Sequence, residues 1–129
     1  MIDTNDGLIT LNVSHVEDLQ ILICHSRIKV RPSIPKNLRW FIGKIDSTLK
    51  IPRTNKLSIL NLGYSQLKTL SKSIIHASEL EVLDMDGCGK LTCLPHSFGS
   101  LKKLQNLDLG GSAIQSLQES FGEVRTWKC

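Results

Sequence analysis

The sequence contains no apolar run that approaches the roughly 18 to 20 residues needed to span a membrane, so no membrane-spanning helix is predicted. Its first residues, Met1 to Asp6, lack the basic and apolar segments of a secretory signal peptide. Because no export signal is recognised, the cysteines Cys24, Cys88, Cys93 and Cys129 are interpreted as free thiols in a reducing compartment. These absences predict a cytoplasmic location, with the nucleus as the alternative.

The sequence also lacks a continuous basic tract, although its net charge is +4. Residues 1–18 sum to −4, residues 19–56 to +8 and residues 57–129 to zero. The bases of the middle segment are spaced among residues such as Pro32, Ile34 and Trp40 and do not form one helical face. We interpret them as a solvated rim or a docking surface for an acidic domain, and nucleic acid is not an expected partner.

One pattern occurs three times along the chain, and its copies begin at Leu57, Leu80 and Leu104. Apolar or small residues recur at offsets 0, 3, 5, 8, 10, 13, 17 and 20, with one residue inserted after Cys88. This spacing lies within the range of periods that leucine-rich repeats have, and the L-x-x-L-x-L core is their signature. The predicted fold is an α/β leucine-rich-repeat solenoid, with a parallel β-sheet on the concave face and a mostly irregular or short-helix return on the convex face.

In each copy, apolar residues alternate with other residues as they do along a β-strand with one buried face. Strands are expected near residues 59–62, 82–85 and 106–109, with their apolar side chains inward and Asp84 and Asp108 exposed. The residues expected to be buried are Leu60, Leu62, Leu83, Met85, Leu107 and Leu109. Offset 8 carries Ser65, Cys88 or Ser112, each small enough to face the interior beside backbone. Pro95 favours an irregular return over a long helix.

Residues 19–56 contain the same pattern in a shorter form. Leu19 and Leu38 each start a copy of the 0, 3, 5 offsets, and the starts at Leu19, Leu38 and Leu57 are evenly spaced but closer together than those of the regular copies. Residues 8–13 alternate too, but Leu8 is too near Leu19 for a full coil, so their place in the fold stays open. We divide the chain into an irregular segment 1–18 acting as a weak cap, degenerate repeats 19–56, regular repeats 57–124 and a truncated tail 125–129.

Residues that carry chemistry are scattered. His15, His25, His76 and His96 have no repeat-consistent partner among Ser or Cys nucleophiles, so no catalytic residue is predicted and the chain is not expected to be an enzyme. Cys88, Cys93 and His96 are close in sequence, but Cys88 takes the small repeat position and Cys93 lies between two inward leucines. No metal site or cofactor is therefore expected.

The segment from Ser33 to Trp40, SIPKNLRW, resembles the start of the repeat region in plant intracellular immune receptors. These are the nucleotide-binding, leucine-rich-repeat disease-resistance proteins, especially those with a Toll/interleukin-1-receptor domain. The stretch from Leu80 to Leu91, LEVLDMDGCGKL, is similar to the cysteine-bearing repeat of that family, and LPHSFGSL from Leu94 matches its return path. The resemblance covers about residues 19–124. It implies a non-enzymatic recognition module for protein–protein contacts in plant defence, innate immunity and signal transduction.

The sequence departs from this family in several places. Gly43 stands where a second aromatic is usual, and no Trp follows Leu70. The G-x-x-x-x-G-K-[ST] phosphate loop is absent, since the nearest string has Asp84 for its first Gly and Leu91 for its last residue. The chain is thus expected neither to bind nor to hydrolyse ATP, and we interpret it as a repeat fragment, a truncated product or a stand-alone module.

The outward strand positions are the candidate binding residues of the concave face. In an aligned sheet Asn61, Asp84 and Asp108 form a column, with Asp86 beside it, and adjacent carboxylates repel. A solvated polar face is the plain interpretation, and a contact site for a basic segment is the functional one. The candidates are Trp40, Ile42, Ile59, Asn61, Tyr64, Val82, Asp84, Asp86, Asn106 and Asp108.

Three kinds of protein remain open from the sequence. The leading one is the immune-receptor module, whose partner is an effector, a host protein or the parent receptor's own domains. The second is a substrate adaptor or scaffold in ubiquitin-ligase or other intracellular signalling, and the third is an extracellular repeat receptor. No membrane partner is expected. Because the tail after Val124 is too short to cover the last coil, self-association through uncapped ends and an unpaired last strand are expected.

Overall fold

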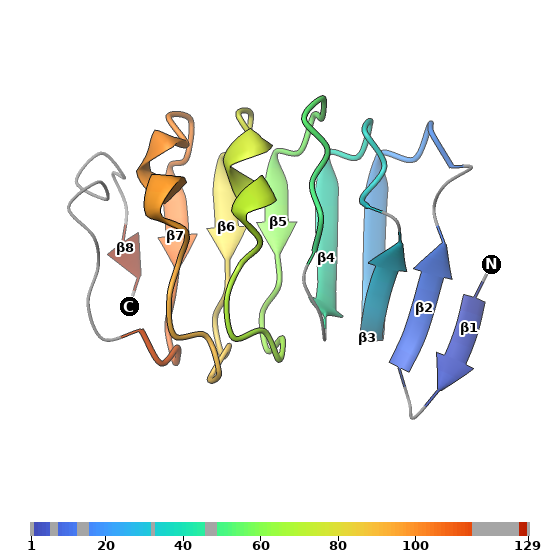
Figure 1. The fold of residues 1–129 in the computed structure, drawn as a ribbon, viewed down its shortest axis with the longest axis horizontal. Helices are drawn as coiled ribbons and strands as arrows, with labels where there is room; N and C mark the ends of the chain where they lie inside the picture. Colours follow the sequence, from blue (N-terminus) through green and yellow to red (C-terminus); the bar gives the residue numbers. More distant parts are fainter. Residues whose placement is uncertain are drawn as a thin grey trace.

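The computed structural model describes residues 2–5, 8–12, 16–31, 33–45, 49–114 and 127–128. In these residues the strands form one sheet whose spatial order equals the chain order, from β1 to β8 (Figure 1). The strands are β1 (Ile2–Asn5), β2 (Leu8–Asn12), β3 (Ile21–Arg31), β4 (Trp40–Ile45), β5 (Ile59–Asn61), β6 (Val82–Asp84), β7 (Asn106–Asp108) and β8 (Trp127–Lys128). All neighbours from β2 onward are parallel, and only β1 and β2 are antiparallel. This is the leucine-rich-repeat solenoid that the sequence predicts.

The return segments lie over one face of the sheet (Figure 1). They include two 3-10 helices, η1 (Lys72–His76) and η2 (His96–Ser100). Ser71 caps η1 by accepting a hydrogen bond from the N–H of Ser73, and Pro95 immediately precedes η2. A proline at that point disfavours extension of η2 toward its N-terminus, and the return is mostly irregular, as expected.

A single apolar core fills the space between the sheet and the returns. The leucines that open the coils, Leu38, Leu57, Leu80 and Leu104, and the strand residues Phe41, Leu60, Leu83 and Leu107 are all buried. The six residues expected to be buried in the regular strands are buried. Each such side chain contributes about 1.5–3 kcal/mol when removed from water, so the leucine spacing largely determines the fold.

The same backbone hydrogen bonds link successive coils at the ends where the strands begin. The N–H groups of Ser58 and Ile59 both donate to the carbonyl of Arg39, at 2.8 and 3.0 Å. Equivalent pairs of bonds join Arg39 and Trp40 to Gln20, Glu81 and Val82 to Ser58, and Gln105 and Asn106 to Glu81. The short coils that start at Leu19 and Leu38 therefore stack as the regular ones do.

The N-terminal segment is more regular than the sequence suggested. Residues 2–12 contain the antiparallel strands β1 and β2, and β2 pairs in parallel with the second half of β3, from Ile9 with Ile28 to Asn12 with Arg31. This places the strand that the leucine spacing left open. β3 serves both neighbours because it is long, and its pairing with β4 shifts register between Ile23 and Arg27.

Two expectations from the sequence are wrong. β7 is not an unpaired edge, because β8 pairs with it in parallel, Leu107 with Trp127. Asp84 and Asp108 are half-buried, not exposed. Each turns an oxygen back onto its own chain, where it accepts the N–H two residues further on at 2.9 Å. The last-coil residues Leu117, Phe121 and Val124 lie outside the described residues.

Candidate recognition surface on the open face of the sheet

The face of the sheet opposite the returns carries the outward side chains of β3 to β7, and we call it the open face. β4 alternates outward and buried residues, and β5, β6 and β7 each bury only their middle residue. The strand register aligns the outward residues in two rows. The first row is Ile21, Trp40, Ile59, Val82 and Asn106, and the second is Ile23, Ile42, Asn61, Asp84 and Asp108.

The β3–β6 part of the open face carries a group of apolar side chains. We call Ile21, Ile23, Trp40, Ile42, Ile59 and Val82 the apolar patch. Ile21, Ile23 and Trp40 are 50%, 52% and 43% exposed, although large apolar side chains are usually buried. Ile21 and Ile23 were missed in the sequence analysis. The repeat spacing could have identified them, because they occupy outward offsets 2 and 4 of the degenerate copy that starts at Leu19.

The β6–β7 part is acidic, and we call Asp84, Asp86 and Asp108 the acidic end. Asp84 and Asp108 are register partners on adjacent strands. A Cβ built on Gly110 would stand 2.9 Å from an oxygen of Asp86 and 3.1 Å from one of Asp108, so these two carboxylates lie close together around one glycine. Within the described residues, no ion pair reaches the three carboxylates.

The fold does not require charge at these positions. Asn61 occupies the same place in the preceding coil and accepts the N–H of Gly63 at 3.0 Å, as Asp84 accepts that of Asp86 and Asp108 that of Gly110. An uncharged amide thus closes the turn equally well. Like charges on directly opposite residues destabilise a sheet, so the carboxylates oppose folding slightly.

Tyr64 is held in a strained position beside the acidic end. Its φ is 61°, in the left-handed region, whereas the equivalent residues of the next two coils are Gly87 and Gly111 with φ of 74° and 72°. One side of the ring lies against Gly87, where a Cβ would stand 2.4 Å from the ring carbon Cε1. The side chain is nevertheless 61% exposed. A left-handed non-glycine residue costs roughly 1–2 kcal/mol, and such strain is common at functional sites.

A hollow of about 300 Å³ lies between these groups. Ile42, Asn61 and Gly63 line it along the middle strands. Tyr64, Asp84 and Asp86 line it on one side, and Lys44 and His25 on the other.

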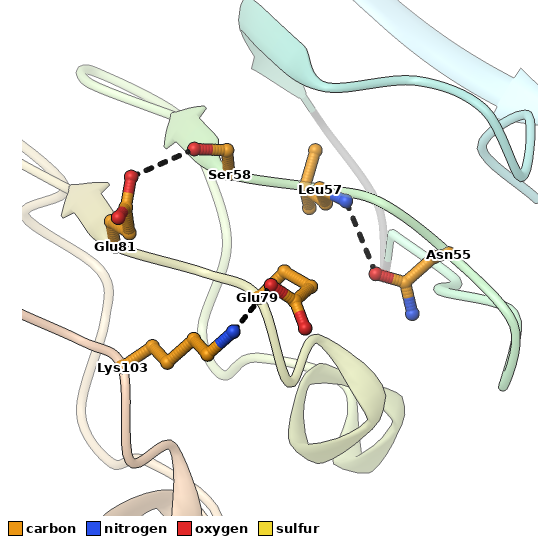
Figure 2. A network of polar contacts seen from close by, with 6 residues as sticks. All are labelled: Asn55, Leu57, Ser58, Glu79, Glu81 and Lys103. Carbon is orange, nitrogen blue, oxygen red and sulfur yellow. Dashed lines mark hydrogen bonds and ion pairs between the residues drawn. The ribbon is translucent and has the colours of Figure 1, made fainter.

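A second hollow, of about 640 Å³, lies where the strands begin and is lined mainly by charged residues. Figure 2 shows its contacts: Ser58 donates to Glu81 at 3.1 Å, and Lys103 pairs with Glu79 at 2.7 Å. The hydrogen bond to Glu79 raises the pKa of Lys103. These groups are exposed, and exposed ion pairs contribute little stability. We call the residues that line this second hollow the charged rim, and we interpret their contacts as links between coils.

Of the described cysteines, Cys24 is part of the lining of the hollow of about 300 Å³, and Cys88 and Cys93 are not. Cys88 is buried, and its Sγ donates to the carbonyl of Leu62 at 3.1 Å. Cys24 is partly buried and Cys93 exposed, and both are free thiols, as is Cys88. Within the described residues, no group of three or more His, Cys, Asp or Glu side chains is arranged to hold a metal ion. In that same part of the chain, no helix is long and apolar enough to cross a membrane.

The structure brings all ten predicted residues together. Eight lie in the two rows of the open face, and Asp86 and Tyr64 follow their strands at the edge of the hollow. The column of Asn61, Asp84 and Asp108 has the predicted register. What the sequence did not predict is the separation of the face into the apolar patch and the acidic end.

Comparisons with known proteins agree with this architecture. Residues 79–101 match the family model of the Leucine Rich Repeat. The chain is also similar to "Disease resistance RPP13-like protein 4" of Arabidopsis thaliana, with 42% identity over 64 residues. That match covers 46% of this chain and 8% of the relative, so the chain spans a small part of the relative's length. No solved structure matches the chain significantly.

Proposed function

We propose that this chain is a non-enzymatic recognition module that binds a polypeptide partner on the open face of its sheet. The observation that carries the proposal is the apolar patch: three large side chains of adjacent strands stand about half exposed in one continuous area. Exposed apolar patches on folded domains mark interaction sites. Leucine-rich-repeat domains are typically non-catalytic and mediate protein–protein interactions, and the similarity to a disease-resistance protein supports the same role.

The partner that we propose is a pathogen effector, a host protein or another domain of a disease-resistance receptor. The cytoplasm is the proposed location, and the Toll/interleukin-1-receptor type of receptor is the proposed parent. ATP binding is not part of the proposal, because the sequence has no phosphate loop.

Site-specific photo-crosslinking in plant leaf cells tests this function. A photoreactive phenylalanine analogue is placed at Trp40 or Ile42 on the open face and, as a matched control, at Lys68 or Thr92, exposed residues of the return. We expect a protein adduct from the open-face positions that the return positions do not give. Equal adducts from both faces, or adducts from the return alone, would contradict the proposal.

A further inference from the structure

The inference concerns the chemistry of the partner, and it rests on the proposed function. We propose that the open face binds a polypeptide segment that carries a bulky apolar residue and, about three or four positions away, an arginine. The apolar residue occupies the apolar patch, and the arginine reaches the hollow between Tyr64 and the acidic end.

Charge complementarity indicates that the bound segment carries a basic residue. The acidic end presents three carboxylates, of which Asp84 and Asp86 line the hollow, against the single lysine Lys44 in the same lining. Among the described residues, none of the three carboxylates forms an ion pair. A nucleic acid or an acidic peptide would be repelled there. A cationic side chain that binds there would offset the repulsion between Asp84 and Asp108, and this would favour the complex.

Two residues at the hollow are expected to lower the free energy of unfolding. The carboxylate of Asp84 makes the same turn contact that the amide of Asn61 makes without charge. Tyr64 holds a left-handed backbone where the next coils have glycine. Local folding favours Asn and Gly at these two positions, and departures from local preference are expected at functional sites.

The arrangement favours arginine over lysine. The ring of Tyr64 rests on Gly87 and is still largely exposed, and the carboxylates of Asp84 and Asp86 line the same hollow. A planar guanidinium can stack on an aromatic ring while it donates two hydrogen bonds to a carboxylate, whereas an ammonium acts as a point charge.

The strand spacing determines how far apart the two features lie. Neighbouring strands are about 4.8 Å apart, so Ile42 on β4 and Asp84 on β6 are separated by roughly 10 Å. An extended peptide covers about 3.3 Å per residue and therefore bridges this span in roughly three residues. The arginine is thus expected about three or four positions from the apolar anchor.

Selection from a phage-displayed library of short random peptides against the full chain tests the inference. We expect enriched peptides to carry arginine three or four positions from a bulky apolar residue. Synthetic versions, measured by fluorescence anisotropy, should bind roughly tenfold more weakly to the Asp84→Asn/Asp86→Asn double variant and to Trp40→Ala. Glu79→Gln, which removes an acid of the charged rim, should bind as the parent chain does.

Each result distinguishes this inference from the proposed function. Peptides without basic residues that still depend on Trp40 would overturn the arginine inference and leave the open face as a binding surface. Peptides that bind all variants equally would overturn both, and a selection without binders would overturn the inference alone. Thermal melting verifies that the variants fold: Asp84→Asn should melt at the parent temperature or higher, because Asn61 shows that the amide closes this turn.

Discussion

At the residue scale, the small residue at offset 8 hydrogen-bonds the backbone of the preceding coil in two successive coils, as an acceptor in the first and as a donor in the second. Ser65 is buried and its hydroxyl accepts the N–H of Ile45 at 2.9 Å, whereas the thiol of Cys88 donates to the carbonyl of Leu62 at 3.1 Å. Both hydrogen-bond a backbone group of the preceding coil, although the carbonyl of Leu62 also accepts the N–H of Ser65 at 3.2 Å. The sequence predicted a small inward residue here. It could not predict which group would donate, because that depends on how the coils stack.

The thiol of Cys88 leads to a prediction on pH dependence. Burial, as the largest cause, raises its pKa above the usual value of 9.0. The folded state therefore keeps the thiol proton at pH values where the unfolded chain loses it. The contribution of Cys88 to stability is fully present below the unfolded pKa and is lost as the pH rises through the folded pKa.

Urea unfolding at a series of pH values from neutral to well above the usual thiol pKa tests this, with Cys88→Ser as the matched variant that lacks the titrating group. We expect the free energy of unfolding of the parent chain to fall more steeply in the alkaline range than that of the variant. Cys24, whose pKa is also raised by burial, is present in both proteins and cancels in the difference. Parallel curves would show that Cys88 titrates normally.

At the element scale, the regular strands were predictable, whereas the pairing of the N-terminal strands was not. The leucine spacing predicts β5, β6 and β7 closely, because the same side chains that define the repeat fill the core. No comparable spacing of residues indicates the antiparallel pairing of β1 with β2 or the register shift in β3. Strand pairing there depends on backbone hydrogen bonds and short connections, and alternation alone does not reveal whether a partner is parallel or antiparallel.

The turns after β5, β6 and β7 share a left-handed residue, and this leads to the second prediction. Gly87→Ala places a Cβ on a residue with φ of 74°, 2.4 Å from the ring of Tyr64. We expect a loss of roughly 1–2 kcal/mol in unfolding free energy from the backbone strain, and more from displacement of the ring. Urea denaturation measures it.

The matched control for this turn is Gly89→Ala. Gly89 has no positive φ, and the nearest atom to its added Cβ is a carbonyl oxygen 3.8 Å away, so little change is expected. In a Tyr64→Ala background Gly87→Ala should destabilise less, since the ring no longer has to move. Equal losses at Gly87 and Gly89 would show that this turn relaxes freely.

At the scale of the whole molecule, the described coils share one core and one sheet, which makes the open face a single rigid surface. The core runs without a break from Ile28 under β3 to Leu109 after β7. The apolar patch extends from β3 to β6 and the acidic end from β6 to β7, all in one sheet, so their relative position is determined by the packing beneath them. A partner therefore meets two features whose spacing does not have to be adjusted on binding, and this reduces the entropy lost in the complex.

This continuity predicts cooperative unfolding. Leu83 is fully buried in the middle strand, and Leu83→Ala should lower the unfolding free energy by about 2–5 kcal/mol. Because a small single core unfolds as one unit, amide hydrogen exchange should accelerate by a similar factor in β4 and β7, although neither contains the substitution. Mass spectrometry of exchange measures both strands together, with Lys90→Ala on the exposed turn as a control that should leave them unchanged. Faster exchange confined to the coil of Leu83 would instead show that the repeats open one at a time, and the open face would then be a set of independent segments.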